Sequence, residues 1–356
     1  MSAGALVIGA VAPDLDALSW LFGGQEAWLK VHAGLSHSPL GLLLLGLALV
    51  PFLRWVEREF IGRSSVFSAG GRRGTCAPAT IVGLLTHVPL DLLTDRGARP
   101  GVPFSEAWIR GDLVYPDDPW LWLIFGGAAA LAGRRTARGS VLLAGAAITG
   151  WMIVLQHDDG PSWLGWVFPV ACLVLAWLRA ADVGRKHAQR TIARAGGLTL
   201  LYLCLLTAGR TQSWQRARAS LERSEPDAVL LSTHPCFARP LTWSVFARSG
   251  LHIFEMRMRW REVPERVELA QDPEHPLVRT AMRLEQSTTW RRYARLSLGT
   301  VEPLPDGGAW VELRDAAEGG RPWDQRLRWR HNFPPEEVAR IQRLFEEEAR
   351  LRGRGE

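Results

Sequence analysis

The sequence has few cysteines, and none is placed as a metal or disulfide site requires. Cys76, Cys172, Cys204 and Cys236 are scattered through 356 residues. Paired Cys-x-x-Cys spacings are typical of zinc sites, and closely spaced even sets are typical of disulfide frameworks. Both kinds of cysteine-stabilised protein are therefore excluded, and we expect the four thiols to pack as small apolar side chains.

Other common signals are also missing. Only two of the 42 basic residues are lysines, and no internal repeat is visible. No basic region precedes the first apolar run, so we expect no cleavable signal peptide. The absence of inverted repeats, and of any sign of a broken helix, argues against the architecture of many secondary transporters.

Apolar runs dominate the first 210 residues. The clearest are 39–53, 119–133, 139–156 and 161–178, and weaker ones are 3–22, 77–93 and 197–209. A helix needs roughly 20 residues to cross the hydrocarbon core, with some tolerance. Small residues within the runs and Trp at their ends are typical of packed transmembrane helices. The pattern predicts a polytopic α-helical membrane domain with six or seven crossings.

The rest of the chain predicts a soluble α+β module. Two strand-like runs are joined by Ser249-Gly250, and two more by Asp306-Gly307-Gly308, as in β-hairpins. Residues 334–353 predict a closing helix with Pro and Glu in its first turn. We predict a membrane-embedded metal-site domain at 1–209, a charged helical linker at 210–224 and the soluble module at 225–356.

Positive charge lies mainly between the apolar runs. Residues 1–224 carry 21 basic and 15 acidic side chains, whereas residues 225–356 carry 21 of each. Most of the basic residues of 1–224 lie in the gaps 54–76, 134–138 and 179–195, and these gaps should therefore be cytoplasmic. The gaps 23–38, 94–118 and 157–160 and the C-terminal module then lie on the outer face. Because topology accounts for the excess charge, we expect no nucleic-acid partner.

Four short segments place ionisable or polar residues in or beside the apolar runs. They hold Asp14 and Asp16; His32, Ser36 and His37; His87, Asp91, Thr94 and Asp95; and Ser105, Asp112 and Asp118. Charged side chains in lipid are costly, so they usually face a bundle interior, where they pair or bind an ion. The predicted topology brings all four segments to the outer membrane face.

The spacing of residues within these segments favours binding of one metal ion by two side chains. His87 and Asp91 are four residues apart on a predicted helix, so they share a face about 6 Å apart at Cβ. Thr94 and Asp95 should extend that face by one turn. By contrast, Asp14 and Asp16 are two residues apart and suit an extended or turn segment after a proline.

A capping signal places the first two histidines. Ser38-Pro39 predicts an N-cap followed by a first-turn proline. His32 and His37 would then lie on a loop that enters the second crossing.

Four ordered motifs resemble those of the YdjM/YfhP-type inner-membrane metal-dependent hydrolase family. They are "APDLD", "HAGLSHS", "THVPLDLLTDRG" and "VPFSEAW…GD…DDP", within residues 1–180. The resemblance implies a multi-pass protein of the bacterial inner membrane with a metal site. Ala33 stands where the family usually has Arg, which removes a candidate phosphate or carboxylate clamp. Only 13 residues precede Asp14, where family members carry a Thr-His element, so we expect a truncated start or one missing ligand.

Pattern and resemblance together predict a divalent metal, most readily zinc or manganese, with iron(II) as a further option. The predicted ligands are Asp14, Asp16, His32, His37, His87 and Asp91. The candidate catalytic residues are Asp16 and Asp95, and the candidate substrate contacts are Ser36, Thr94, Ser105, Asp112 and Asp118. A mixed imidazole–carboxylate set without Cys suits a catalytic site. Six ligands exceed the three of a typical mononuclear zinc enzyme, so one or two ions are expected.

The hypothesis from sequence is a membrane-bound hydrolase for a membrane-associated ester or phosphoester, acting through a metal-activated water. Two alternatives stay open. One is an ion or solute transporter with an intramembrane Asp/His path. The other is a non-catalytic membrane scaffold with a structural metal. The lipid bilayer and a membrane-associated substrate are the expected partners.

Overall fold

Apolar helices and two antiparallel sheets make up the computed structural model. It describes residues 3–61, 76–133, 135–157, 160–262, 264–269, 271–317 and 328–352. Contacts divide the chain into two units, residues 1–112 with Thr288–Tyr293, and residues 113–287 with 294–356. This division reflects which residues contact one another and not which of them lie in the membrane. The predicted end of the membrane domain at 209 and start of the soluble module at 225 therefore stay predictions.

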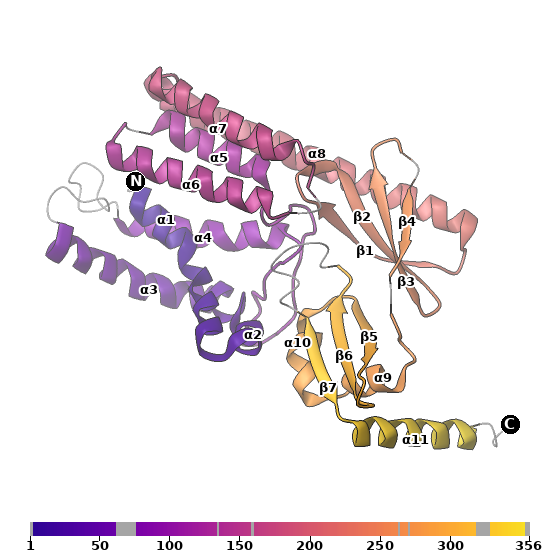
Figure 1. Cartoon of the computed structure of the whole chain (residues 1–356). Helices are drawn as coiled ribbons and strands as arrows, with labels where there is room; N and C mark the ends of the chain where they lie inside the picture. Colours follow the sequence, from indigo (N-terminus) through magenta and orange to yellow (C-terminus); the bar gives the residue numbers. More distant parts are fainter. Residues whose placement is uncertain are drawn as a thin grey trace. The chain divides into compact units, whose positions relative to one another are not determined.

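The first unit consists of helices (Figure 1). They are α1 (Ala3–Val11), a 3₁₀ segment (Ala12–Ser19), α2 (Trp20–Val31), a 3₁₀ turn (Leu35–His37), α3 (Pro39–Val56), a π-helical turn (Glu57–Ile61), α4 (Cys76–Leu93) and α10 (Thr288–Tyr293). Ser38 caps α3 as predicted, because its side chain accepts a hydrogen bond from the Gly41 amide.

Five described helical stretches are long and apolar enough to cross a membrane. They are Gly4–Val31, Pro39–Glu59, Cys76–Leu93, Ala137–Leu155 and Arg185–Ser224, and the shorter apolar helices are Pro119–Ala132 and Leu164–Ala180. Leucines and valines stay exposed along these helices, as on surfaces that face lipid rather than water. The prediction of a helical membrane domain is confirmed.

The first of these stretches is broken, contrary to the expectation of no broken helix. It passes from α1 into the 3₁₀ segment, where Pro13 supplies no backbone N–H, and then into α2. A second kink lies at Gly23 and Gly24, and Gly24 has a φ of +60°. Asp14 and Asp16 therefore lie on a 3₁₀ helix, whereas their spacing suggested an extended or turn segment rather than a helix.

Helices α1 and α4 approach each other closely through glycine. A Cβ on Gly9 would lie 2.3 Å from the Thr80 carbonyl oxygen, and one on Gly83 would lie 2.3 Å from the Leu6 carbonyl oxygen. Small residues at such crossings let two membrane helices pack backbone to backbone. This crossing brings the end of α1 beside Thr80 and Gly83 of α4.

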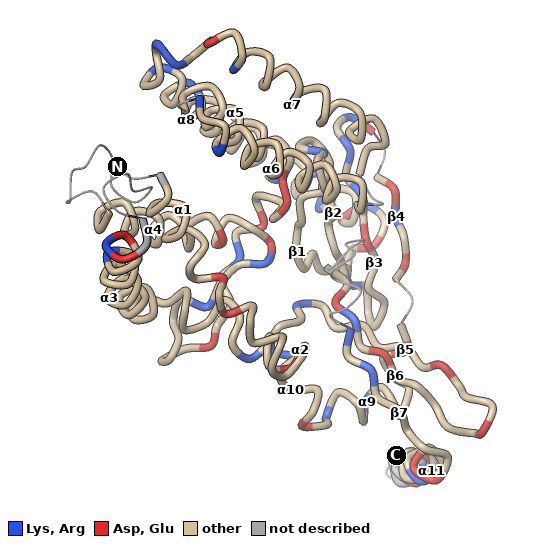
Figure 2. Tube along the Cα trace, turned by 60° about the vertical axis from the view of Figure 1, so that its left-hand side comes forward, with Lys and Arg blue, Asp and Glu red and all other residues tan. Residues whose placement is uncertain are grey.

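The second unit begins with four helices, α5 (Pro119–Ala132), α6 (Ala137–Leu155), α7 (Leu164–Ala180) and α8 (Ala188–Ser224). The connections after α5 and α7 lie at one end of these helices, and the connection after α6 lies at the other. Basic residues gather at the first end, where Figure 2 shows blue segments; among the described ones are Arg135, Arg138, Arg179, Arg185 and Lys186.

A four-stranded sheet packs against the C-terminal half of α8. Its order is β1 (Val229–Cys236), β2 (Arg239–Ser249), β3 (His252–Arg259) and β4 (Glu265–Glu268), all antiparallel. Ser249 pairs with His252, so the hairpin turn is Gly250-Leu251, one residue later than predicted. Gly250 has a φ of +57°, which explains why glycine leads this turn.

A second sheet completes this unit. It comprises β5 (Ser297–Pro303), β6 (Ala309–Asp315) and β7 (Trp329–Phe333), with α9 (Pro276–Ala281) and α11 (Pro335–Arg352) beside it. The predicted Asp306-Gly307-Gly308 turn joins β5 to β6, and Gly307 has a φ of +90°. The closing helix α11 is also confirmed, so the α+β part of the fold prediction holds.

Aromatic side chains fasten the four-stranded sheet to the helices. Phe237, between β1 and β2, stacks on His157 after α6 with ring centroids 3.9 Å apart. The Trp120 indole at the start of α5 donates to the Ala238 carbonyl at 3.1 Å. Since α5 starts and α6 ends here, the sheet joins the helices at the end opposite the basic residues.

We predict that Gly83→Val separates α1 from α4 and abolishes metal binding without altering a candidate ligand. The added side chain meets backbone atoms of α1, and such overpacking costs about 1–3 kcal/mol. Metal content and thermal unfolding of the purified protein measure both effects. Gly46→Val on α3 is the control, because a Cβ there meets only a Leu84 methyl at 3.6 Å. Full metal content in Gly83→Val would contradict the role of this crossing.

Candidate metal centre

Four ionisable residues from three segments of the first unit converge. Asp14, His37, His87 and Asp91 each offer one ligand atom, and these atoms all lie within 4.8 Å of one another. Asp14 comes from the 3₁₀ segment after α1, His37 from the 3₁₀ turn before α3, and the other two from successive turns of α4. All four are among the six ligands that the sequence predicts.

The distances within this cluster suit a single cation. His37 Nε2, His87 Nε2 and Asp91 Oδ2 are mutually separated by 3.1 Å, and Asp14 Oδ1 lies 3.7 and 3.5 Å from the two nitrogens. Bonds of about 2.0–2.2 Å to a tetrahedral zinc ion would separate the ligand atoms by roughly 3.3–3.6 Å. Two imidazole nitrogens facing each other have little reason to meet unless a proton or a cation lies between them. The donor set and its spacing therefore fit a divalent metal.

Accessibility differs within the cluster. The His37 side chain is fully buried and that of His87 is 12% exposed, whereas that of Asp14 is 49% exposed. Burial lowers the pKa of His37, but its contacts with Asp14 and Asp91 outweigh burial and leave this pKa raised. A proton thus competes with a cation for the same nitrogen, since a metal binds neutral imidazole.

Asp16 lies behind His37 rather than within the four-residue cluster. Its Oδ2 accepts hydrogen bonds from the Ser36 hydroxyl at 2.6 Å and the Ala33 amide at 2.9 Å, and it lies 3.5 Å from His37 Nδ1. Ser36 Oγ also lies 2.8 Å from His37 Nδ1. Carboxylates behind a metal-binding histidine fix its orientation and tautomer. The geometry favours this role for Asp16 and Ser36, and their predicted ligand, catalytic and substrate roles stay predictions.

His32 also lies outside the four-residue cluster. Its Nδ1 is 3.0 Å from Asp16 Oδ1, and its ring stacks on Trp28 with centroids 4.3 Å apart. Trp28 in turn meets the edge of Tyr293, from α10. The predicted ligation by His32 stays a prediction, and the observed contacts anchor its ring beside the carboxylate that orients His37.

Sequence reasoning missed Arg99, which clamps the turn between α2 and α3. Its guanidinium donates to the carbonyls of Lys30 at 2.9 Å and His32 at 2.7 Å, and its amide donates to Ala33 O at 2.7 Å. The residue is only 7% exposed, and burial lowers its pKa. Ala33 has a φ of +51°, a strained conformation that these bonds hold in place. Its carbonyl partners lie 69 and 67 positions earlier in the chain, so nothing in the local sequence signals this role.

The other predicted site residues of this unit lie outside the four-residue cluster. Helix α4 ends at Leu93, so Thr94 and Asp95 do not extend the face of His87 as expected. The Thr94 hydroxyl donates to the Asp91 carbonyl at 2.8 Å, and Asp95 is buried. Ser105 accepts a bond from the Ala107 amide, and Asp112 is buried with a φ of +51°. Their catalytic or substrate roles stay predictions.

Asp118 belongs to the second unit and has structural partners there. It caps α5 by accepting hydrogen bonds from the amides of Trp120 and Leu121 at 2.8 and 3.2 Å. The Tyr202 hydroxyl of α8 donates to it at 2.7 Å. Burial raises the pKa of this carboxyl despite these bonds. The observed bonds account for Asp118 without a substrate, and its predicted substrate contact stays a prediction.

Comparison with known proteins identifies the family. The model of the family described as YdjM inner membrane protein matches residues 2–183, about half of the chain, and the chain belongs to this family. The matched region includes all four segments that carry the candidate site. No curated protein and no solved structure matches the chain.

We predict that Asp16→Asn weakens metal binding about 10–100-fold without abolishing it. Loss of the carboxylate behind His37 frees the imidazole orientation, and changes behind a ligand typically have effects of this size. Isothermal titration of the detergent-purified protein with zinc measures the change. His87→Ala should abolish the same binding, and His252→Ala, at an exposed histidine paired with Glu268, should leave it unchanged. Wild-type affinity in Asp16→Asn would contradict the orienting role.

Proposed function

We propose that this inner-membrane protein is a metal-dependent hydrolase for a membrane-associated ester or phosphoester. The observation that carries the proposal is the convergence of two imidazoles and two carboxylates, from three separate segments, on one point. Such a constellation is expensive to assemble in an apolar helical domain, so it marks a functional site.

The chain's own residues have distinct roles in this proposal. Asp14, His37, His87 and Asp91 would hold the cation, and Asp16 with Ser36 fixes the His37 ring. A divalent metal would supply Lewis acidity toward the scissile group and lower the pKa of a water. The half-exposed Asp14 side chain leaves one side of the cluster accessible to substrate.

Asp16 is poorly placed to take a proton. Its Oδ2 already accepts two hydrogen bonds and its Oδ1 lies within bonding distance of His32. A general base needs a free oxygen within reach of the water that it activates. We therefore assign Asp16 to positioning, and the general-base role that the sequence suggests for Asp95 stays a prediction.

We place the C-terminal module on the outer face. The basic residues of the second unit gather at one end of its helices, which the positive-inside rule assigns to the cytoplasm. The four-stranded sheet is fastened at the opposite end through Phe237 and Trp120. Helix α8 connects the two ends without a break.

A structural metal is the second candidate function. Four protein donors at near-tetrahedral spacing would complete the coordination of zinc, whereas catalytic zinc sites usually have three protein ligands and one open position. Asp14 decides between these functions, because an exposed carboxylate can give way to substrate and a buried fourth ligand cannot.

Turnover of an aryl phosphodiester and an aryl ester by the detergent-purified protein tests the proposal. We expect hydrolysis with added zinc or manganese, its loss on chelation and its recovery when metal is restored. His87→Ala should reduce turnover to background, while His252→Ala should retain it. Hydrolysis that survives chelation would refute the metal-dependent mechanism. Full metal content without turnover of either substrate class would favour the structural metal.

Sidedness is tested separately with single cysteines in a variant whose four native cysteines are replaced. Leu251→Cys, in the β2–β3 turn, should react with a membrane-impermeant maleimide in cells with a permeabilised outer membrane. Arg138→Cys, at the start of α6, should react only after the inner membrane is disrupted. Labelling with the opposite pattern would reverse the proposed orientation.

A further inference from the structure

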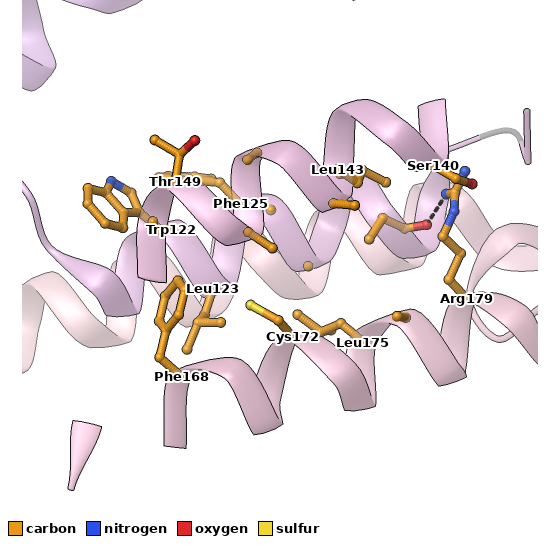
Figure 3. Close-up of a pocket in the computed structure, with 18 of the residues that line it drawn as sticks. Trp122, Leu123, Phe125, Ser140, Leu143, Thr149, Phe168, Cys172, Leu175 and Arg179 are labelled. Carbon is orange, nitrogen blue, oxygen red and sulfur yellow. Dashed lines mark hydrogen bonds between the residues drawn. The ribbon is translucent and has the colours of Figure 1, made fainter. Parts of the chain in front are cut away.

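A large apolar groove lies among three helices of the second unit. It has a volume of about 890 Å³ between α5, α6 and α7, and Figure 3 shows Arg179 at one end of it. Arg179 donates to the Ala130 carbonyl, and Arg135, which also lines the groove, lies 3.5 Å from Asp182. Both arginines are engaged within the protein, and the contacts that reach the metal centre lie elsewhere, in the first unit.

Helix α10 belongs to the first unit although it lies far along the chain. The first unit comprises residues 1–112 and Thr288–Tyr293, and Figure 1 shows α10 beside α2. The family model matches residues 2–183. A segment outside the family match thus forms part of the unit that carries the metal centre.

Both ends of α10 are tied to the C-terminal part of the chain. Directly before it, the Ser287 hydroxyl donates to the Ala281 carbonyl at 2.8 Å. Directly after it, Asp315 at the end of β6 accepts hydrogen bonds from the amides of Arg295 and Leu296 at 2.7 and 2.9 Å. These bonds fix where the chain enters the short helix and where it leaves.

Tyr293 anchors α10 within the first unit. Its ring meets those of Trp28 and Trp108 edge to face, with centroids 6.2 and 5.4 Å apart, and the residue is only 7% exposed. Arg110 donates to the Tyr293 carbonyl at 2.7 Å. Edge-to-face pairs have a preferred geometry, so Tyr293 restricts the orientation of the Trp28 ring as well as its position.

A continuous line of contacts leads from Tyr293 to a candidate metal ligand. Trp28 stacks on His32 with centroids 4.3 Å apart and ring planes 19° apart. His32 Nδ1 lies 3.0 Å from Asp16 Oδ1, and Asp16 Oδ2 lies 3.5 Å from His37 Nδ1. The Asp16 side chain is only 4% exposed, so it cannot turn without displacing these partners. The position of Trp28 therefore restricts the orientation of the His37 ring.

We propose that Tyr293 is a positioning residue of the metal centre. Its ring holds Trp28 against His32. His32 in turn holds the Asp16 carboxylate, which orients His37. This role rests on the metal centre of the proposed function and requires no particular reaction. A residue from outside the family match thereby supports the candidate site within it.

Cobalt(II) titration of the detergent-purified full-length protein tests this role, because the visible absorption of bound cobalt reports its coordination geometry. We expect Tyr293→Ala to weaken cobalt binding about tenfold, the lower end of effects behind a ligand, and to change this spectrum. Tyr293→Phe keeps the ring and should retain both wild-type affinity and spectrum. Arg292→Gln, also on α10, is the control and should change neither, since its ion pair with Glu106 is exposed.

A double-mutant cycle with Asp16→Asn distinguishes positioning from general stabilisation of the fold. If Tyr293 acts through Asp16, Tyr293→Ala should weaken binding much less in the Asp16→Asn protein than in the wild type. Equal losses in the two backgrounds would overturn the proposed route. Wild-type affinity and spectrum in Tyr293→Ala would overturn the role itself.

Trp28→Leu tests the same route if Tyr293→Ala does not fold, because it keeps an apolar side chain and removes only the ring that stacks on His32. It should weaken cobalt binding and change the spectrum, and an unchanged spectrum would overturn the proposal. A wild-type protein that binds no cobalt would refute the metal centre, and this role with it. Cobalt binding without hydrolysis of either test substrate would refute only the proposed reaction.

Discussion

Mutual compensation among ionisable side chains in an apolar setting is the constraint on which the first unit depends. Asp14, His37, His87 and Asp91 lie in an apolar helical domain, and each is tolerated because the others face it at 3–4 Å. An isolated carboxylate or imidazolium there would be far more costly. The close packing of α1 on α4 through glycine backbones is what makes that compensation available.

Much of this centre follows from local sequence. The i, i+4 spacing of His87 and Asp91 requires only that α4 be helical, and charge asymmetry along the chain predicts that Asp14 and His37 lie at the same membrane face. Sequence spacing does not distinguish a metal ligand from a residue that only orients a ligand, so Asp16 and Asp14 both appeared as ligands in the sequence. Their neighbours separate them: Asp16 meets the Ala33 amide and Ser36, whereas Asp14 faces two imidazoles.

Long-range contacts explain the rest of what the sequence did not reveal. Arg99 reaches the carbonyls of Lys30 and His32, some 70 positions earlier in the chain, and nothing in its local pattern signals this. Tyr293 of α10 lies in the predicted soluble module, yet it packs against Trp28. The broken first helix was also missed, because Pro13 near a helix end is equally compatible with a turn.

Helix α8 has a consequence for how the protein responds to its bilayer. Its 37 residues extend about 55 Å, and the hydrocarbon core occupies only about 30 Å of that. The four-stranded sheet packs against the C-terminal half of this helix. In the orientation proposed above, the depth at which the basic start of α8 is anchored would set the height of the sheet above the opposite headgroups. A thinner bilayer would then raise that sheet in proportion to the lost thickness.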